Sequence, residues 1–271
     1  EMTAGVVLWM APAMLLYLAT DAHRVFIWLI PAFLIHAALV TVEGLTHWYL
    51  VENVMVREGT NTGLSNNPNL AAGFLVIGIV YLMASKRSLF QALSLPLVVA
   101  LLFTGSRWGI IVPVAVIGVM ASSGAIPWRV LGGGLLALFI TVVAVGLVGG
   151  GYQVAGYGSI AAALNPVVTD VGVRLAIPHL PSFLPHGVAE HPGLHNVPLR
   201  IAIENGLIAA GIWVGITVWA MRPWATGETL HRWLLLTLML LSVLDYYTWM
   251  GHLGGFWWLL IGLLTKPYAR T

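Results

Sequence analysis

Residues 69–122 read NLAAGFLVIGIVYLMA-SKRS-LFQALSLPLVVALLF-TGSR-WGIIVPVAVIGVMAS, which is three apolar runs separated by two short polar breaks. The three runs carry no charged side chain, and each is too long for a typical strand but long enough for a helix. A helix that is apolar on every side belongs in a large protein core or in a lipid bilayer. The stretch therefore predicts three helices joined by tight connections.

The same pattern recurs along the 271 residues, which are 59% hydrophobic and only 8% charged, with a mean hydropathy of +0.91. This composition is typical of a membrane protein. Several runs are shorter than the roughly 20 residues that a membrane span needs, so their ends are soft or the helices are broken. We expect an all-α polytopic membrane protein with about nine transmembrane helices, at residues 4–20, 25–42, 69–84, 90–104, 108–122, 130–148, 199–221, 233–247 and 253–265.

The charged residues sort by side of this predicted bundle. Basic side chains gather in alternate connections, at Arg24, Lys86, Arg87, Arg129, Arg222, Arg232, Lys266 and Arg270. Most acidic side chains fall on the opposite side, at Glu1, Glu43, Glu52, Glu58, Asp170, Glu190, Glu204 and Asp245. The positive-inside rule then places the C-terminus in the cytoplasm and the connection 149–198 outside. The net charge of only +2 gives no indication of a nucleic-acid partner.

The connection 149–198 is a long periplasmic loop within one membrane domain, residues 1–271. Its six prolines exclude long helices. Ionisable side chains are concentrated from residue 168 to residue 204, and charge placed beside hydrocarbon usually marks a functional site. We expect the chemistry of the protein here.

His195 and Asn196 stand at the end of this loop. Asn196 is a helix N-cap candidate with Pro198 in the first turn, which would hold His195 at the positive end of a helix. Such a histidine suits a general base, and the alternative is an ordinary loop histidine at an interface. Arg200 and Glu204, spaced i,i+4, suit a structural ion pair.

Two further arginines are candidates for an anion site. Arg107 lies in the polar break 104–109, which is either a hairpin turn with a snorkelling arginine or an outward-facing anion site. Arg174 is the only basic residue between Arg129 and Arg200. Converging guanidinium groups would suit a diphosphate, because they donate hydrogen bonds in a planar fork.

No metal or other cofactor is expected. His186, His191 and His195 fall at spacings of five and four, but Pro192 and Gly193 break the helix that a zinc site of this kind would need. The chain has no Asp-x-Asp pair, no Walker A loop and no cysteine. Asn67-Pro68 is interpreted as a capped helix start with no chemistry of its own.

Together these elements resemble the O-antigen ligase and polymerase superfamily, from residue 66 to the C-terminus. The resemblance is carried by Asn67-Pro68-Asn69, the Thr-Gly-Ser-Arg-x-Gly element at 104–109, Arg174 in the long loop, His195-Asn196-x-x-Leu199, and Glu204-x-Gly206-Leu207-Ile208. Between residues 178 and 193 the family pattern is only partly matched. Because family members have about a dozen spans, we expect the chain to be a fragment of a twelve-helix protein.

The resemblance implies a metal-independent membrane glycosyltransferase of the GT-C type in the bacterial inner membrane. It would transfer a glycan from a polyprenyl-diphosphate donor to a hydroxyl of lipid A–core, of a growing polysaccharide or of a protein, at the periplasmic face. By resemblance, His195 is the base on the acceptor, Arg107 and Arg174 act in catalysis by holding the diphosphate, and Asn196 and Arg200 contribute to substrate binding.

The alternative is a secondary transporter or flippase for an anionic or lipid-linked substrate. Broken helices and buried arginines occur in transporters too. Their sites usually lie near the bilayer midplane between repeats, whereas the polarity here gathers at one rim and the sequence shows no repeat.

Overall fold

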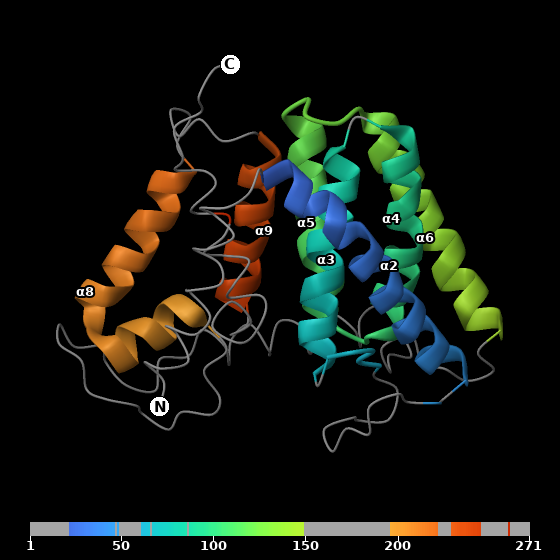
Figure 1. The fold of residues 1–271 in the computed structure, drawn as a ribbon, viewed down its shortest axis with the longest axis horizontal. Helices are drawn as coiled ribbons and strands as arrows, with labels where there is room; N and C mark the ends of the chain where they lie inside the picture. The colour runs from blue at the N-terminus through green and yellow to red at the C-terminus, as the bar shows by residue number, and fades with distance from the viewer. Residues whose placement is uncertain are drawn as a thin grey trace. The chain divides into compact units, whose positions relative to one another are not determined.

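The computed structural model describes residues 22–46, 48, 61–65, 67–85, 87–148, 196–221, 229–244 and 260. Every regular element among them is an α-helix, which confirms the all-α prediction for this part of the chain. The predicted helices 4–20 and 253–265 lie outside the described residues, except for Leu260. The helices are α2 (Ala22–Thr46), α3 (Pro68–Ala84), α4 (Ser88–Phe103), α5 (Arg107–Ser122), α6 (Trp128–Val148), α8 (Val197–Ala220) and α9 (Thr229–Leu244) (Figure 1).

These helices belong to two compact units, and each unit is described by itself. One unit is Val25–Val167 and holds α3 to α6 with nearly all of α2. The other combines Glu1–Arg24 with Val168–Thr271 and holds α8 and α9, which pack against each other. The organisation of residues 1–271 as one domain stays a prediction.

Helix α3 is the centre of the first unit. It runs beside α4 and α5 and packs against both (Figure 1). Its sequence is apolar on every side, and Leu75, Ile77, Ile79 and Leu82 are fully buried. Helix α6 packs against α4 and α5. The apolar run 69–84 therefore forms the core of this unit, as expected of a helix without a polar face.

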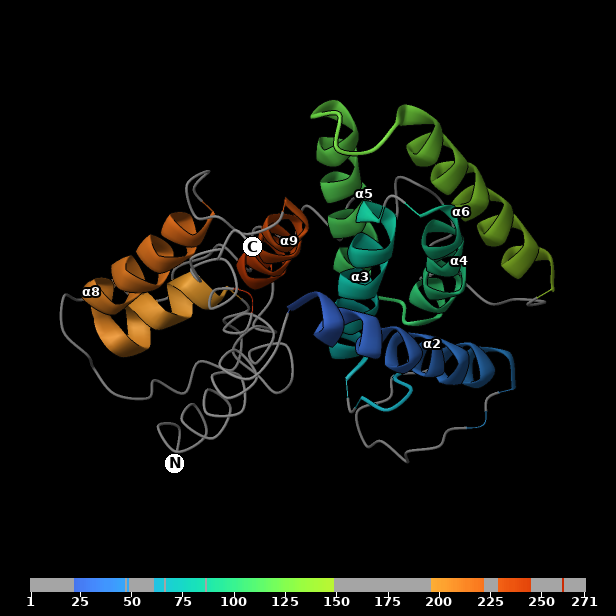
Figure 2. The ribbon, with the colours of Figure 1, turned by 45° about the horizontal axis from the view of Figure 1, so that its top comes forward.

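Helix α2 crosses α3 obliquely (Figure 2). The rings of Phe33 and Phe74 pack with centroids 4.7 Å apart. Gly78 permits this approach, because a Cβ at this position would lie 2.9 Å from the Phe33 ring. Further along α2, Gly44 packs against the ring of Phe103, the last residue of α4, and leaves no room for a Cβ. Helix α2 is thus fixed both to α3 and to the end of α4.

One predicted helix is broken. Gly206 interrupts α8 with φ +88° and ψ 163°, so two helical segments meet at an angle there (Figure 1). Glycine is the residue that adopts a positive φ without steric cost. The run predicted as a single helix over 199–221 is therefore two shorter helices.

Among the described residues, the helical segment Ile27–Thr46 is both long and apolar enough to cross a membrane. The apolar helices Pro68–Ala84, Ser88–Phe103, Trp108–Ser122, Gly206–Ala220 and Arg232–Val243 are shorter. The all-helical architecture is thus established for the described part of the chain, and the nine-span arrangement is taken up below as a proposal.

Candidate functional site

Two helix N-termini lie side by side at one end of the first unit. Helix α3 begins at Pro68 and α5 begins at Arg107. Their first turns are in close contact, because a Cβ on Gly109 would lie 2.8 Å from the Cβ of Ala72. Each N-terminus carries the positive end of a helix dipole, while α4 ends beside them at Phe103 with the negative end of its own dipole.

Both helix starts are capped by polar side chains. Asn67 Oδ1 accepts a hydrogen bond from the Asn69 N–H at 2.8 Å, with Pro68 in the first turn. Ser106 Oγ accepts from the Gly109 N–H at 3.2 Å. The predicted cap at Asn67-Pro68 is confirmed.

The polar break that contains Arg107 is a tight turn between α4 and α5. Thr104 Oγ1 donates to the Leu101 carbonyl at 2.7 Å and accepts from the Ser106 N–H at 3.2 Å. Gly105 turns the chain with φ +67°. Arg107 is the first residue of α5, so the hairpin-turn interpretation holds for the backbone, and its role in binding an anion stays a prediction.

A buried carboxylate lies near this turn. The side chain of Glu43 is only 1% exposed. Its Oε2 accepts hydrogen bonds from the backbone N–H groups of Thr62 at 2.9 Å and Gly63 at 2.8 Å. Within the part of the chain that the structure describes, Glu43 Oε1 and Thr62 Oγ1 are buried without a hydrogen bond. Burying a carboxylate costs free energy unless it is hydrogen-bonded or paired, so its position here indicates a structural or functional role.

Segment 61–65 connects this carboxylate to α4. The Asn61 side-chain amide donates to the Phe103 carbonyl at 2.7 Å. Gly63 has φ +55° and lies against α2, where a Cβ would meet Val40 and His36. The His36 ring packs edge-on against Phe74, with centroids 5.4 Å apart.

We call five of these side chains the turn cluster: Glu43, Asn61, Thr62, Thr104 and Ser106, all of them buried. Sequence reasoning counted Glu43 only as one of the outer acids and did not single out Asn61 or Thr62. The available signal was His36 and Glu43, which are seven residues apart and therefore on one face of a predominantly apolar helix.

The second unit holds two of the predicted binding residues. Asn196 is the N-cap of α8: its Oδ1 accepts from the Leu199 N–H at 2.9 Å, and Pro198 lies in the first turn. This confirms the predicted cap. Arg200 lies in the same turn, partly exposed, and its N–H donates to the Asn196 carbonyl at 2.8 Å. Asn196 and Arg200 are thus neighbours, and their relation to Arg107 stays a prediction.

The remaining predicted residues lie outside the described part of the chain. They are His195 and Arg174, with the side chains of Arg107 and Glu204 and the histidines of the rejected zinc site, His186 and His191. The predicted Arg200–Glu204 ion pair is therefore also outside it. Within the described residues, no group of three or more histidine, aspartate or glutamate side chains forms a metal site.

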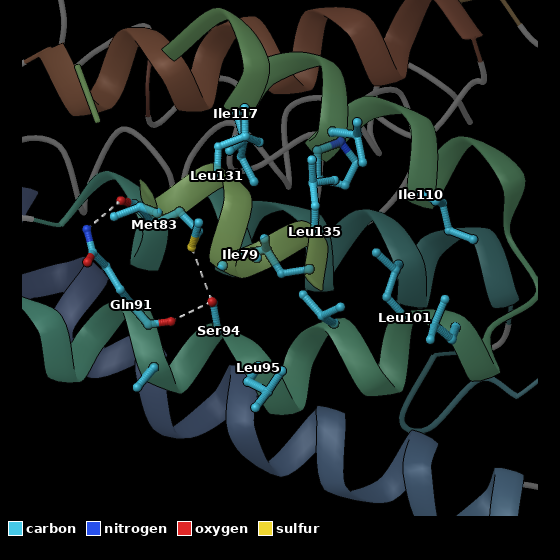
Figure 3. Close-up of a pocket in the computed structure, with 18 residues that line it drawn as sticks. Ile79, Met83, Gln91, Ser94, Leu95, Leu101, Ile110, Ile117, Leu131 and Leu135 are labelled. Atoms are coloured by element: carbon cyan, nitrogen blue, oxygen red, sulfur yellow. Dashed lines mark hydrogen bonds between the residues drawn. The ribbon is translucent and has the colours of Figure 1, made fainter. Parts of the chain in front are cut away.

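An apolar cavity of about 360 Å³ lies between α3, α4, α5 and α6. Met83, Gln91 and Ser94 are at one end, while Leu101 and Ile110 are at the other (Figure 3). Apart from Gln91 and Ser94, the residues that line it are hydrophobic or glycine. Ile110 lies three residues after Arg107, so the cavity reaches the first turns of α5. Its lining suits a hydrocarbon chain.

No protein-family model, curated protein or solved structure matches this chain.

Proposed function

We propose that this protein is a multi-pass glycosyltransferase of the bacterial inner membrane, with about nine spans in this chain. It transfers a glycan from a polyprenyl-diphosphate donor to an acceptor hydroxyl at the periplasmic face. The sequence resemblance to the O-antigen ligase and polymerase superfamily suggests the reaction. The observation that carries the proposal is the contact between the first turns of α3 and α5, with Arg107 at the start of α5.

The charge at this end suits a diphosphate. Two helix N-termini present partial positive charge to the same region, and Arg107, the first residue of α5, would supply a guanidinium group. A diphosphate is a strong acceptor that guanidinium groups bind in a fork. Arg174 would supply the second guanidinium from the long loop.

The exposed surface supports a membrane environment. Large hydrophobic side chains lie exposed along α6, including Leu135, Leu136, Phe139 and Ile140. Similar side chains are exposed on α2, α5 and α8. Exposing such side chains to water costs about 25 cal/mol for each Å² of apolar surface, whereas lipid solvates them. The helices shorter than a full span would be accommodated by bilayer thinning, tilted neighbours or broken spans.

The apolar cavity supports a lipid-linked donor. It extends along α4 from the first turns of α5 towards Gln91 (Figure 3). A donor with its diphosphate at the start of α5 would have hydrocarbon-lined space for its prenyl chain within one helical turn of Arg107. Head and tail would then meet surfaces of matching polarity.

In the proposed reaction, the acceptor oxygen attacks the sugar carbon that is bonded to the donor diphosphate. His195 removes the hydroxyl proton as the new glycosidic bond forms. The bond between the sugar and the diphosphate breaks, and polyprenyl diphosphate leaves with the negative charge. Arg107 and Arg174 stabilise this charge, while Asn196 and Arg200 bind substrate at the start of α8.

A second candidate is a transporter or flippase for an anionic or lipid-linked substrate. Two observations favour it: the break in α8 at Gly206 and the buried carboxylate of Glu43. Broken helices and buried ionisable groups are frequent in transporters. The two candidates differ in their product, because a flippase moves the donor across the bilayer and forms no new glycosidic bond.

Reconstitution of the purified protein with lipid-linked glycans from the source cells tests the proposal. Release of polyprenyl diphosphate and labelling of acceptor hydroxyls should both be observed and should survive EDTA. His195→Ala should lower the transfer rate by roughly 10²- to 10⁴-fold, and Arg107→Lys and Arg174→Lys should impair it because lysine lacks the fork. His231→Ala, outside every motif of the resemblance, is the control. Normal transfer by His195→Ala, or lipid movement without transfer, would contradict the proposal.

A further inference from the structure

We infer that Glu43 and Asn61 are positioning residues for the start of α5. Glu43 fixes segment 61–65 to α2, and Asn61 fixes the same segment to the end of α4. Together the two contacts set the position of the Arg107 backbone relative to the N-terminus of α3. This inference rests on the proposed function, in which Arg107 binds the donor diphosphate.

The first step is the anchor on α2. Glu43 Oε2 accepts hydrogen bonds from the backbone N–H groups of two consecutive residues, Thr62 and Gly63. The carboxylate therefore fixes the backbone of the segment rather than a flexible side chain. The bonds are buried, so their loss would leave two backbone N–H groups without a partner. Helix α2 is itself fixed to α3 through the Phe33–Phe74 pair.

The second step is the contact with α4. The carbonyl of Phe103 belongs to the last residue of α4, where a helix leaves its final carbonyls without an intrahelical partner. The Asn61 amide donates to this carbonyl at 2.7 Å, from 42 residues away in the sequence. Gly44 packs against the Phe103 ring and holds the same residue from α2.

The third step is the short distance along the chain from Phe103 to Arg107. Only Thr104, Gly105 and Ser106 intervene, and they form one tight turn held by their own hydrogen bonds. A shift of the Phe103 carbonyl therefore moves the first turn of α5 against α3. A displacement of about 1 Å can cost on the order of 100-fold in a positioned interaction.

The test uses undecaprenyl diphosphate as the probe, with undecaprenol, which has no charge, as the comparison ligand. Binding to the purified full chain in nanodiscs is measured for Asn61→Leu, for Arg107→Gln and for the double variant. Ser123→Ala is the matched control, because Ser123 also donates a side-chain hydrogen bond to a backbone carbonyl at a helix end, that of Met120 at 3.0 Å, away from the cavity. Asn61→Ser, a milder change, takes the place of Asn61→Leu if the latter does not yield folded protein.

If Asn61 acts through Arg107, Asn61→Leu should weaken binding of the diphosphate lipid by about tenfold and leave undecaprenol binding unchanged. The same substitution should have less than about a twofold effect when Arg107→Gln is already present, because the two changes remove one interaction. Ser123→Ala should bind both ligands normally. Glu43→Leu, which removes the acceptor of the two N–H groups, should weaken binding of the diphosphate lipid as Asn61→Leu does, and Glu43→Gln, which keeps an oxygen acceptor, should weaken it less.

Equal weakening by Asn61→Leu in both backgrounds, or parallel loss of undecaprenol binding, would overturn the positioning role and leave the proposed function standing. Normal diphosphate binding by Arg107→Gln would contradict the proposed function itself. It would also overturn the positioning role, since Arg107 would then have no contact to position.

Discussion

The two ends of α4 are built differently. At the end near Ser88, the polar contacts join α4 to itself and to the adjacent end of α3: Gln91 bonds to the Ser85 carbonyl, and Ser94 bonds to the Gln91 carbonyl and to Met83 Sδ. At the other end, Asn61 reaches the Phe103 carbonyl from 42 residues away.

This difference separates a connection from a site. A turn between apolar helices needs only nearby hydrogen bonds, and the described contacts of the Ser88 end come from α4 and the adjacent end of α3. The Phe103 end instead gathers polar groups from α2, segment 61–65 and the α4–α5 turn, and buries them. Polar groups brought together from distant segments and buried carry a desolvation cost that a simple turn avoids, which is why we place the function there.

The largest expected difference is that the two ends of α4 lie on opposite sides of the membrane. Leu64, beside the turn cluster, and Leu89, at the opposite end of α4, are both exposed, at 57% and 67%. The chain has no cysteine, so Leu64→Cys and Leu89→Cys each introduce a single thiol. In intact cells, an impermeant maleimide should label Leu64→Cys, whereas Leu89→Cys should react only after permeabilisation, following the positive-inside rule. The reverse pattern would exclude a periplasmic site.

The next largest effect should be on stability. Glu43→Leu leaves the N–H groups of Thr62 and Gly63 buried without an acceptor, which should lower the free energy of unfolding by about 2–4 kcal/mol. Ser94→Ala, the buried hydroxyl of the other end, should cost only about 0.5–1.5 kcal/mol. Denaturant unfolding of the protein in detergent micelles measures both. Similar losses for the two variants would mean that the turn cluster is no more demanding than an ordinary turn.

A smaller effect should come from the close packing of α2 on α4. Gly44→Ala places a methyl group against the Phe103 ring, and overpacking of this kind costs about 1–3 kcal/mol. Gly118→Ala on α5 is the matched control, since no atom lies within 4 Å of the added Cβ. It should be neutral or slightly stabilising, because alanine favours helix. If Gly44→Ala unfolds at the same midpoint as Gly118→Ala, the close approach of α2 to Phe103 is wrong.

Sequence reasoning anticipated the local features of this protein. Seven of the predicted helices are present in the described residues, and the caps at Asn67 and Asn196 are as predicted. Both features depend only on residues that are close in the sequence, namely the length of an apolar run and the capping side chain beside it. The break at Gly206 did have a signal that the prediction overlooked, because Asn205-Gly206 is a dipeptide typical of turns.

The turn cluster could not be predicted in the same way. Asn61 and Glu43 lie 18 positions apart and belong to no motif, and their partners are backbone groups whose positions depend on how α2 crosses α3. Such contacts follow from tertiary packing. The convergence of Arg107, Arg174 and His195 on one donor is a prediction of the resemblance, and it stays a prediction.

The most direct test of the central claim, that a diphosphate lipid binds at the Phe103 end of α4, is thiol protection in the purified protein. The rate of maleimide reaction is measured for Leu64→Cys and Leu89→Cys, with and without undecaprenyl diphosphate. We expect the diphosphate lipid to slow the reaction of Leu64→Cys several-fold and to leave Leu89→Cys unchanged, and undecaprenol to protect neither as strongly. Protection of Leu89→Cys instead, or equal protection by undecaprenol, would contradict a diphosphate site at this end.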